Sequence, residues 1–390
     1  MDNQIIGWDV GGAHLKAALL DSDGKLLKVL QVPCALWRGL IELEVAIETI
    51  LNAFTRIPVL HAITMTGELV DLFANRKGGV QAISHVMDAK LNGIKQFYVG
   101  RIDLNALATG LADFVTLPQV EDNWQHIASA NWLASASFIG ALLQQQIKVH
   151  EDRAYKNIQH GLLIDIGSTT SDFVLLENFK PVCLGFTDAE RMQSEELVYS
   201  GVIRTPLMAV TQKIKFKSSV TSVAAEYFAT TADVYRLTGD LQVADDMADT
   251  ADGQDKSELA SARRIARMIG RDVEDAPMAA WVELAQEFKL QQLMRLKAVA
   301  ESHILRIKNN NQANKMTIIG AGAGCFLAKE IASLLNLMYV DIAELIETNI
   351  EPNNEAPSNI LNNTAQWAGV CLPAVAVAYL ASNQSKLIIN

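Results

Sequence analysis

The sequence lacks three features that would each indicate a particular class of protein. Its 390 residues include only 4 cysteines, which are scattered and form no C-x-x-C pair. Their scarcity argues against a disulfide framework or a structural zinc site and favours a reducing compartment. No Lys- or Arg-rich run is present and the net charge is −11. Neither a nucleic acid nor an anionic membrane surface is therefore expected as a partner.

Long apolar runs and clustered histidines are missing as well. The apolar stretch at 368–381 contains Pro373 and is too short to span a bilayer. The N-terminus shows no signal-peptide pattern, and the 7 histidines include no HExxH motif. These absences predict a cytoplasmic protein without a membrane-spanning segment.

What is present is a motif that occurs twice. Residues 5–20 and 162–176 each contain an apolar strand, an Asp-x-Gly turn rich in small residues, and a second apolar strand. Glycine permits the tight turn, and small neighbours leave successive N–H groups available to an anion. The preceding carboxylate can hold Mg²⁺, whose other ligands would be water and phosphate oxygens. The motif residues are Asp9, Gly11, Gly12 and Lys16 in the first copy and Asp165, Gly167, Ser168, Thr169, Thr170 and Asp172 in the second.

Two copies in a chain of this length indicate two domains. Either copy taken alone could be a hairpin turn without a ligand. Turns seldom need so many small or hydroxylated residues after an aspartate, whereas phosphate oxygens use such donors. We therefore expect the two loops to form a phosphate clamp.

A third candidate is the glycine-rich turn with Gly320, Gly322 and Gly324, which follows an expected strand at 316–319. It resembles a dinucleotide-binding turn, but Cys325 stands where the G-x-G-x-x-G pattern requires glycine. Two interpretations stay open. The turn either packs a strand tightly against a helix or forms a glycine shelf for a nucleoside or another flat group.

Three further features each allow two interpretations. Glu68 follows an expected strand at 62–65, where α/β proteins place functional side chains, or it simply starts the next helix. Arg204, in a loop made rigid by Pro206, either binds a diphosphate or is an ordinary surface side chain. The D-D-x-x-D run at 245–249 matches a Mg²⁺-diphosphate pattern, but we favour a solvated acidic loop.

Both hairpins and the glycine turn together resemble the actin-like ATPase superfold, an α/β fold in which two ribonuclease H-like domains close on a nucleotide. Further strings narrow the resemblance to the hydantoinase A/oxoprolinase-like family, in its tetrahydromethanopterin-linked one-carbon-transfer branch. These strings are residues 7–13, 65–69, 130–132, 165–172, 199–206 and 249–253.

The resemblance implies a division of the chain around a phosphate-binding cleft. Residues 1–153 would form the first ribonuclease H-like domain and 154–365 the second, with a helical insertion at about 222–307. Residues 366–390 would be a C-terminal helix that returns to the first domain. Local patterns add helices over 41–54, 130–143 and 326–335 and strands at 96–99 and 337–340.

The resemblance also implies a reaction. It points to a transferase of methanofuran or methylofuran biosynthesis that joins an aminomethylfuran-methyl diphosphate to the phenol of tyramine or γ-glutamyl-tyramine and releases pyrophosphate. Mg²⁺ would bind at Asp9 and Asp165, and Lys16 or Arg204 would neutralise the leaving group. The general base would be Glu68 or Asp172.

Two alternatives of other classes remain. One is an ATP-dependent kinase or hydrolase of the same superfold, and the other is a non-catalytic, ATP-responsive assembly protein of the actin kind. ATP therefore stays open as a ligand, and a homo-oligomeric state stays open too.

Overall fold

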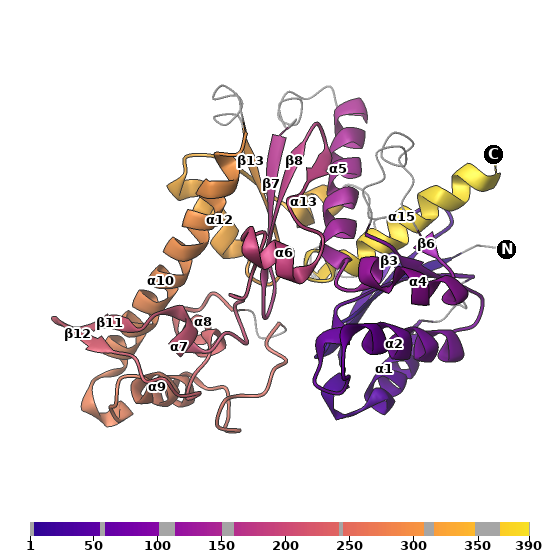
Figure 1. Cartoon of the computed structure of the whole chain (residues 1–390). Helices are drawn as coiled ribbons and strands as arrows, with labels where there is room; N and C mark the ends of the chain where they lie inside the picture. The colour runs from indigo at the N-terminus through magenta and orange to yellow at the C-terminus, as the bar shows by residue number, and fades with distance from the viewer. Residues whose placement is uncertain are drawn as a thin grey trace, which may run out of the picture. The chain divides into compact units, whose positions relative to one another are not determined.

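The computed structural model describes residues 4–54, 59–100, 114–149, 160–241, 245–307, 316–347 and 367–389. The chain divides into two compact units (Figure 1). Unit 1 comprises Met1–Gln159, Leu176–Glu196 and Ile342–Asn390, and unit 2 comprises His160–Leu175 and Leu197–Asp341. The domain boundaries that we predicted after residues 153 and 365 lie outside the described residues.

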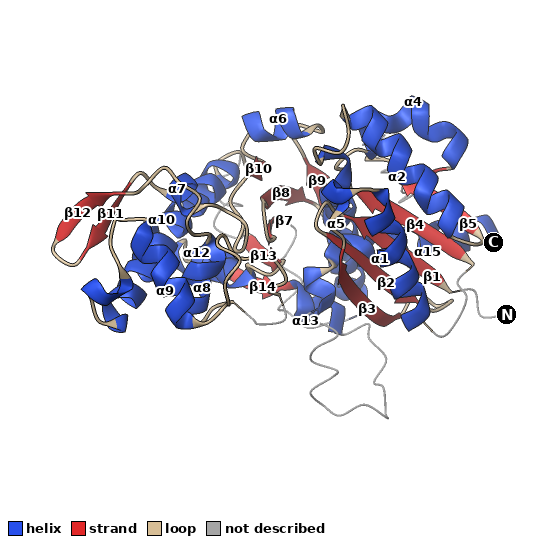
Figure 2. Cartoon of the chain, turned by 90° about the horizontal axis from the view of Figure 1, so that it is seen from below, coloured by secondary structure: helices blue, strands red, loops and turns tan. Residues whose placement is uncertain are grey.

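Unit 1 is built on a six-stranded sheet with the strand order β3-β2-β1-β4-β5-β6 (Figure 2). The first three strands form an antiparallel meander, whereas β4 runs parallel to β1 and β5 runs parallel to β4. The strands are β1 (Ile5–Val10), β2 (His14–Leu20), β3 (Leu26–Pro33), β4 (Leu60–Met65), β5 (Ile94–Tyr98) and β6 (Phe114–Val115).

Helices pack on both faces of this sheet. On one face α1 (Leu40–Ala53), α2 (Arg76–Lys90) and α4 (Leu117–Ile127) bury a core that includes Trp8. The other helices and short elements of the unit are η1 (Leu36–Arg38), η2 (Gly67–Leu69), α5 (Asn131–Val149), β9 (Lys180–Val182), α6 (Asp188–Gln193), α13 (Ile342–Glu347) and α15 (Leu372–Ile389).

The helix α15 packs against β1, β2, β4 and α5. Gly7 lies so close to it that a Cβ at this position would overlap the carbonyl oxygen of Ala374. Because side chains alternate along a strand, Asp9 points to the same side of β1 as Gly7, away from the core that contains Trp8. The C-terminal helix therefore covers the side of the sheet that carries the first aspartate.

Unit 2 repeats the arrangement of the first sheet. Its strand order is β10-β8-β7-β13-β14, with β10 antiparallel to β8 and with β13 parallel to both β7 and β14. This shared order is that of the ribonuclease H-like fold, so the predicted class, two such domains of the actin-like ATPase superfold, is confirmed. The strands are β7 (His160–Ile166), β8 (Ser171–Glu177), β10 (Leu197–Val198), β13 (Thr317–Ala321) and β14 (Met338–Asp341).

Between β10 and β13 the chain adds a mostly helical region (Figure 1). The helices α8, α9 and α10 pack against one another, and α10 also contacts α12 and β11. The β11–β12 hairpin was not anticipated from the sequence. The elements of this region are α7 (Leu207–Val210), β11 (Lys213–Phe216), β12 (Ser219–Ser222), α8 (Thr231–Thr238), α9 (Glu258–Arg267), η3 (Val273–Asp275) and α10 (Met278–Ile304), and α12 (Cys325–Leu334) follows β13.

A network of ion pairs holds this helical region together. The buried Arg264 donates from Nε to Asp233 Oδ1 at 2.8 Å and from Nη1 to Asp252 Oδ1 at 2.9 Å. Arg236 donates to both carboxylate oxygens of Asp246, at 2.6 and 3.0 Å. The interpretation of the acidic run as a solvated loop is therefore wrong for Asp246, which pairs with an arginine.

Cys34, Cys183, Cys325 and Cys371 are all free thiols. Among the described helices, none combines the length and apolar character needed to cross a membrane.

Candidate active site

The two Asp-x-Gly hairpins are closed by the same hydrogen bond. In the first, Gly11 N donates to His14 O at 3.0 Å, and in the second, Gly167 N donates to Thr170 O at 2.9 Å. Each glycine thus has its N–H engaged in the turn. The N–H groups of Gly11 and Gly167 therefore close the turns, and donation to an anion falls to the residues that follow them.

Each hairpin is also joined in the same way to the segment after a neighbouring parallel strand. In unit 1, Thr66 N donates to Val10 O at 2.9 Å, directly after β4. In unit 2, Gly324 N donates to Ile166 O at 2.8 Å, after β13. Both aspartates therefore lie at the carboxyl end of a central strand, where open α/β sheets bind their ligands.

Asp9 is almost fully buried, with 4% of its surface exposed. Its cross-strand partner is Lys16, whose Nζ lies 3.8 Å from Asp9 Oδ2 and donates to Val370 O at 3.0 Å. Burial raises the pKa of Asp9, and the charge of Lys16 partly offsets that rise. Asp9 Oδ1 is buried without a hydrogen-bond partner among the described residues, so it is available to a hard cation. In the same loop, a Cβ on Gly12 would meet the side chain of Val70, which follows η2.

The second hairpin surrounds its carboxylate differently. Asp165 is half-buried, and its Oδ1 lies 2.5 Å from where a Cβ on Gly322 would stand. Ser168 Oγ and Thr169 Oγ1 are 3.4 Å apart, and either can donate. Asp172 is half-buried on β8 opposite Leu197. These hydroxyls retain the chemistry predicted for a phosphate loop.

Residues 200–205 fasten the second hairpin in place. Ser168 O accepts hydrogen bonds from Ile203 N at 3.1 Å and from Arg204 N at 2.8 Å. A Cβ on Gly201 would overlap the backbone of Ser168. Arg204 thus reaches the predicted phosphate loop through its backbone, while its side chain is exposed. The sequence motif at 199–206 thus contains residues that hold the second hairpin in place.

The three glycines of the third motif pack against protein atoms. A Cβ on Gly320 would meet the ring of Tyr339, and one on Gly324 would meet Ile166. Gly322 has a φ of +79°, in the left-handed region that favours glycine. These contacts favour the packing-turn interpretation over a nucleoside shelf, and binding of a flat group here stays a prediction.

Glu68 lies on η2, and its buried carboxylate belongs to a polar cluster that the sequence did not reveal. Its Oε1 accepts from Ser129 Oγ at 2.7 Å and from Arg76 Nη2 at 3.1 Å. Arg76 Nη2 also donates to Ser129 Oγ at 2.9 Å and to Asp188 Oδ2 at 3.2 Å. Burial raises the pKa of Glu68, and the hydrogen bond from Ser129 and the charge of Arg76 partly offset it.

The cluster joins segments far apart in the chain. Arg76 is the first residue of α2, Ser129 precedes α5 and Asp188 starts α6. The only hint in the sequence was Ser129, which lies next to the motif string at 130–132. Glu68 Oε2 is buried without a hydrogen-bond partner among the described residues.

A metal ion bound by the described residues would have few protein ligands. The described part of the chain contains no group of three or more His, Cys, Asp or Glu side chains that could hold a metal ion. A magnesium ion held by one carboxylate together with water and phosphate oxygens fits the buried, unpartnered Oδ1 of Asp9.

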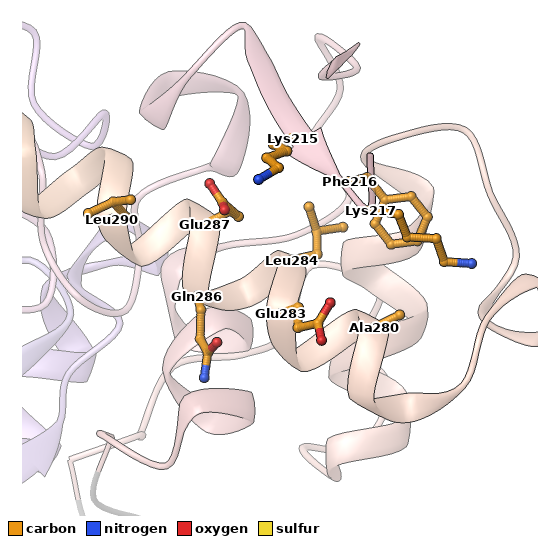
Figure 3. Close-up of a pocket in the computed structure, with 9 residues that line it drawn as sticks. All are labelled: Lys215, Phe216, Lys217, Ala280, Glu283, Leu284, Gln286, Glu287 and Leu290. Carbon is orange, nitrogen blue, oxygen red and sulfur yellow. The ribbon is translucent and has the colours of Figure 1, made fainter. Parts of the chain in front are cut away.

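A separate pocket of about 290 Å³ lies in unit 2 between β11 and α10 (Figure 3). Lys215 and Lys217 line it together with Glu283 and Glu287, and Phe216 forms part of its apolar wall. Its positive and negative side chains are balanced in number, and none of the predicted site residues lines it.

The fold and the paired loops define a two-unit α/β protein with an aspartate at the carboxyl end of each central strand. The chain belongs to the hydantoinase/oxoprolinase family, whose model matches residues 60–347. It is 27% identical over 324 residues to the (4-{4-[2-(gamma-L-glutamylamino)ethyl]phenoxymethyl}furan-2-yl)methanamine synthase of Methanocaldococcus jannaschii, covering 83% of this chain and 87% of that protein. The synthase of the same name from Methanococcus vannielii is 34% identical over 127 residues, covering 33% of this chain and 57% of that protein.

Solved structures give more distant matches. The activator of the 2-hydroxyisocaproyl-CoA dehydratase from Clostridium difficile, with bound ADPNP, matches 99% of this chain and 98% of its own at 10% identity and a TM-score of 0.43. Nucleotide-free acetone carboxylase matches 85% of this chain and 67% of its own at 10% identity and a TM-score of 0.48.

Proposed function

We propose that this chain is a synthase of methanofuran-type cofactor biosynthesis that forms an aryl ether. The observation that carries the proposal is the similarity over 83% of the chain to the synthase of Methanocaldococcus jannaschii. The name of that enzyme describes a phenoxymethyl-furan with an aminomethyl group on the furan and a glutamylated aminoethyl group on the phenyl ring. The bond formed thus joins a phenol oxygen to a methylene carbon on the furan.

The methylene carbon must carry a leaving group, for which we propose diphosphate. The phenol oxygen bonds to the methylene carbon, the carbon–oxygen bond to the diphosphate breaks, and the products are the ether, pyrophosphate and one proton. The furan ring can share positive charge on the methylene carbon, so neutralising the departing pyrophosphate is the main task of the protein.

The two hairpins supply groups suited to that task. Asp9 would hold Mg²⁺ through its unpartnered Oδ1, and Asp165 would be the metal ligand of the second loop; the metal would neutralise charge on the leaving pyrophosphate. Lys16 stands beside Asp9, and Arg204 is attached through its backbone to the second loop. Either cation can donate to pyrophosphate oxygens.

Glu68 is the general base that we favour for the phenol, whose ordinary pKa is about 10. Its Oε2 is buried without a partner among the described residues. Leaving a buried acceptor unsatisfied costs about 1–3 kcal/mol, a cost that a catalytic role would explain. Asp172 remains the second candidate.

One experiment separates this function from the ATP-dependent alternatives. The protein is incubated with Mg²⁺ and the aminomethylfuran-methyl diphosphate, together with either tyramine or γ-glutamyl-tyramine, and the products are identified by mass spectrometry. We expect the ether without ATP. Formation of ADP from ATP, with no ether from the diphosphate, would replace the proposal with a kinase or hydrolase.

A further inference from the structure

We infer that Arg76, Ser129 and Asp188 are positioning residues that fix Glu68 through its Oε1 atom and so reserve its Oε2 atom for the proton of the acceptor phenol. The inference rests on the proposed function, because it assigns Glu68 as the base of that reaction. It adds three residues that no sequence motif had assigned.

The hydrogen bonds give Glu68 one engaged and one open oxygen. Ser129 Oγ has a single proton, and its contact with Glu68 Oε1 at 2.7 Å is shorter than its contact with Asp188 Oδ2 at 3.2 Å. The hydroxyl therefore donates to Glu68 and accepts from Arg76 Nη2 at 2.9 Å. Arg76 thus donates to Ser129, and Ser129 donates to Glu68 Oε1. Glu68 Oε2 has no hydrogen-bond partner among the described residues.

The backbone at Ser129 supports a specific role for this hydroxyl. Ser129 has a φ of +51°, in the left-handed region that non-glycine residues seldom occupy. Strained backbone conformations of this kind persist only where the surrounding structure imposes them, and they are most frequent at functional sites. The chain keeps serine here although glycine would adopt this backbone without strain.

Asp188 opposes Arg76 in setting the charge of Glu68. Arg76 Nη2 is shared between Glu68 Oε1 at 3.1 Å and Asp188 Oδ2 at 3.2 Å. In the described structure these are the charged groups on this hydrogen-bonded cluster, one from α2 and one from α6. Removing Arg76 should raise the pKa of Glu68. Removing the charge of Asp188 should leave Arg76 paired with Glu68 alone, and this should lower the pKa of Glu68.

The test is the pH dependence of kcat/KM for ether formation in the full chain. Arg76→Met should move the acidic limb of the profile upward by about one to three pH units, and Asp188→Asn should move it downward by about one unit. Arg76→Lys, which keeps the charge, should restore most of the wild-type profile. Lys77→Met is the matched control, because the neighbouring Lys77 pairs with the exposed Glu121 and not with Glu68.

Ser129 gives a second comparison. Ser129→Ala and Ser129→Gly both remove the hydroxyl, but only glycine relieves the strained φ. Both variants should move the acidic limb of the kcat/KM profile to higher pH, even if their melting temperatures differ. Shifts of Arg76→Met and Asp188→Asn in the same direction, or a loss of rate without a shift in either, would overturn the inference.

A carbon-13 NMR titration of the Glu68 carboxyl separates this inference from the proposed function. If the wild-type protein forms no ether, the proposed function fails. The titration then still reports whether Arg76 and Asp188 shift Glu68 in opposite directions. Unchanged titration of Glu68 in both variants would contradict the positioning role by itself.

Discussion

The hairpins at Asp9 and Asp165 have the same turn hydrogen bond and the same link to a neighbouring strand, but their carboxylates have different surroundings. Asp9 is buried and faces a lysine from the adjoining strand. Asp165 is half-buried, and its position depends on the missing side chain of Gly322. The two hairpins thus share their backbone hydrogen bonds, but different neighbouring groups position the two carboxylates.

This difference separates two ways of preparing a carboxylate for a cation. In unit 1 the protein supplies its own positive charge, so that an otherwise costly buried carboxylate is tolerated. In unit 2 the carboxylate is placed by tight backbone packing. The variants below test each means, starting with the largest expected effect.

Asp9→Asn should reduce ether formation by at least about 10²–10³-fold, the cost typical of losing one preorganised electrostatic group. Its melting temperature should stay the same or rise at neutral pH, because an amide is cheaper to bury than a carboxylate. The exposed Asp122 provides the control, and Asp122→Asn should leave the rate unchanged. Wild-type activity in Asp9→Asn would remove the first hairpin from the mechanism.

Gly322→Ala should destabilise unit 2 and displace Asp165, because the new Cβ would overlap the backbone oxygen of Ile166 and stand 2.5 Å from Asp165 Oδ1, in a backbone with a φ of +79°. We expect a loss of about 2–4 kcal/mol of unfolding free energy. Gly270→Ala is matched in backbone, with a φ of +66° and no atom within 4 Å of its Cβ. Equal urea midpoints for the two variants would show that the close contacts of position 322 with Ile166 and Asp165 are unimportant for stability.

Lys16→Met should lower stability by roughly 1–3 kcal/mol at pH 7, since it removes the partner of a buried carboxylate and the donor to Val370 O. Lys16 lowers the pKa of Asp9, so its loss raises that pKa further. A carboxyl with a raised pKa in the folded state stabilises the fold only when it is protonated. The deficit measured by urea unfolding should therefore shrink as the pH falls from 7 toward 4, and a constant deficit would contradict the pairing.

Arg204→Gln should have the smallest effect on stability, within about 0.5 kcal/mol, because its side chain is exposed and its backbone bonds remain. We expect a higher KM for the diphosphate substrate and an unchanged melting temperature. Lys213→Gln, another exposed cation of unit 2, is the control. An unaltered KM would leave Arg204 as an ordinary surface residue.

Local sequence patterns predicted the elements that frame the site. The helix expected at 41–54 is α1, the strands expected at 62–65 and 96–99 correspond to β4 and β5, and the glycine turn does lie between β13 and α12. Strong hydrophobic periodicity and glycine-bounded turns determine such elements locally.

The partners of Glu68 could not be predicted in the same way. Arg76, Ser129 and Asp188 belong to three different segments, and only the tertiary fold brings their side chains to one carboxylate. The acidic run was misjudged for a similar reason, since Asp246 looks solvated until Arg236 from α8 is placed beside it. Charge pairing between distant segments leaves no periodic pattern in a sequence.

The central claim, that the hairpins serve a diphosphate substrate, is tested most directly by counting products. Pyrophosphate and ether are quantified in parallel from the furan-methyl diphosphate and tyramine or γ-glutamyl-tyramine, with Mg²⁺ and without ATP. The account predicts equal amounts of the two products from the wild-type protein and neither from Asp9→Asn. Ether formation that requires ATP, or that proceeds unchanged in Asp9→Asn, would contradict it.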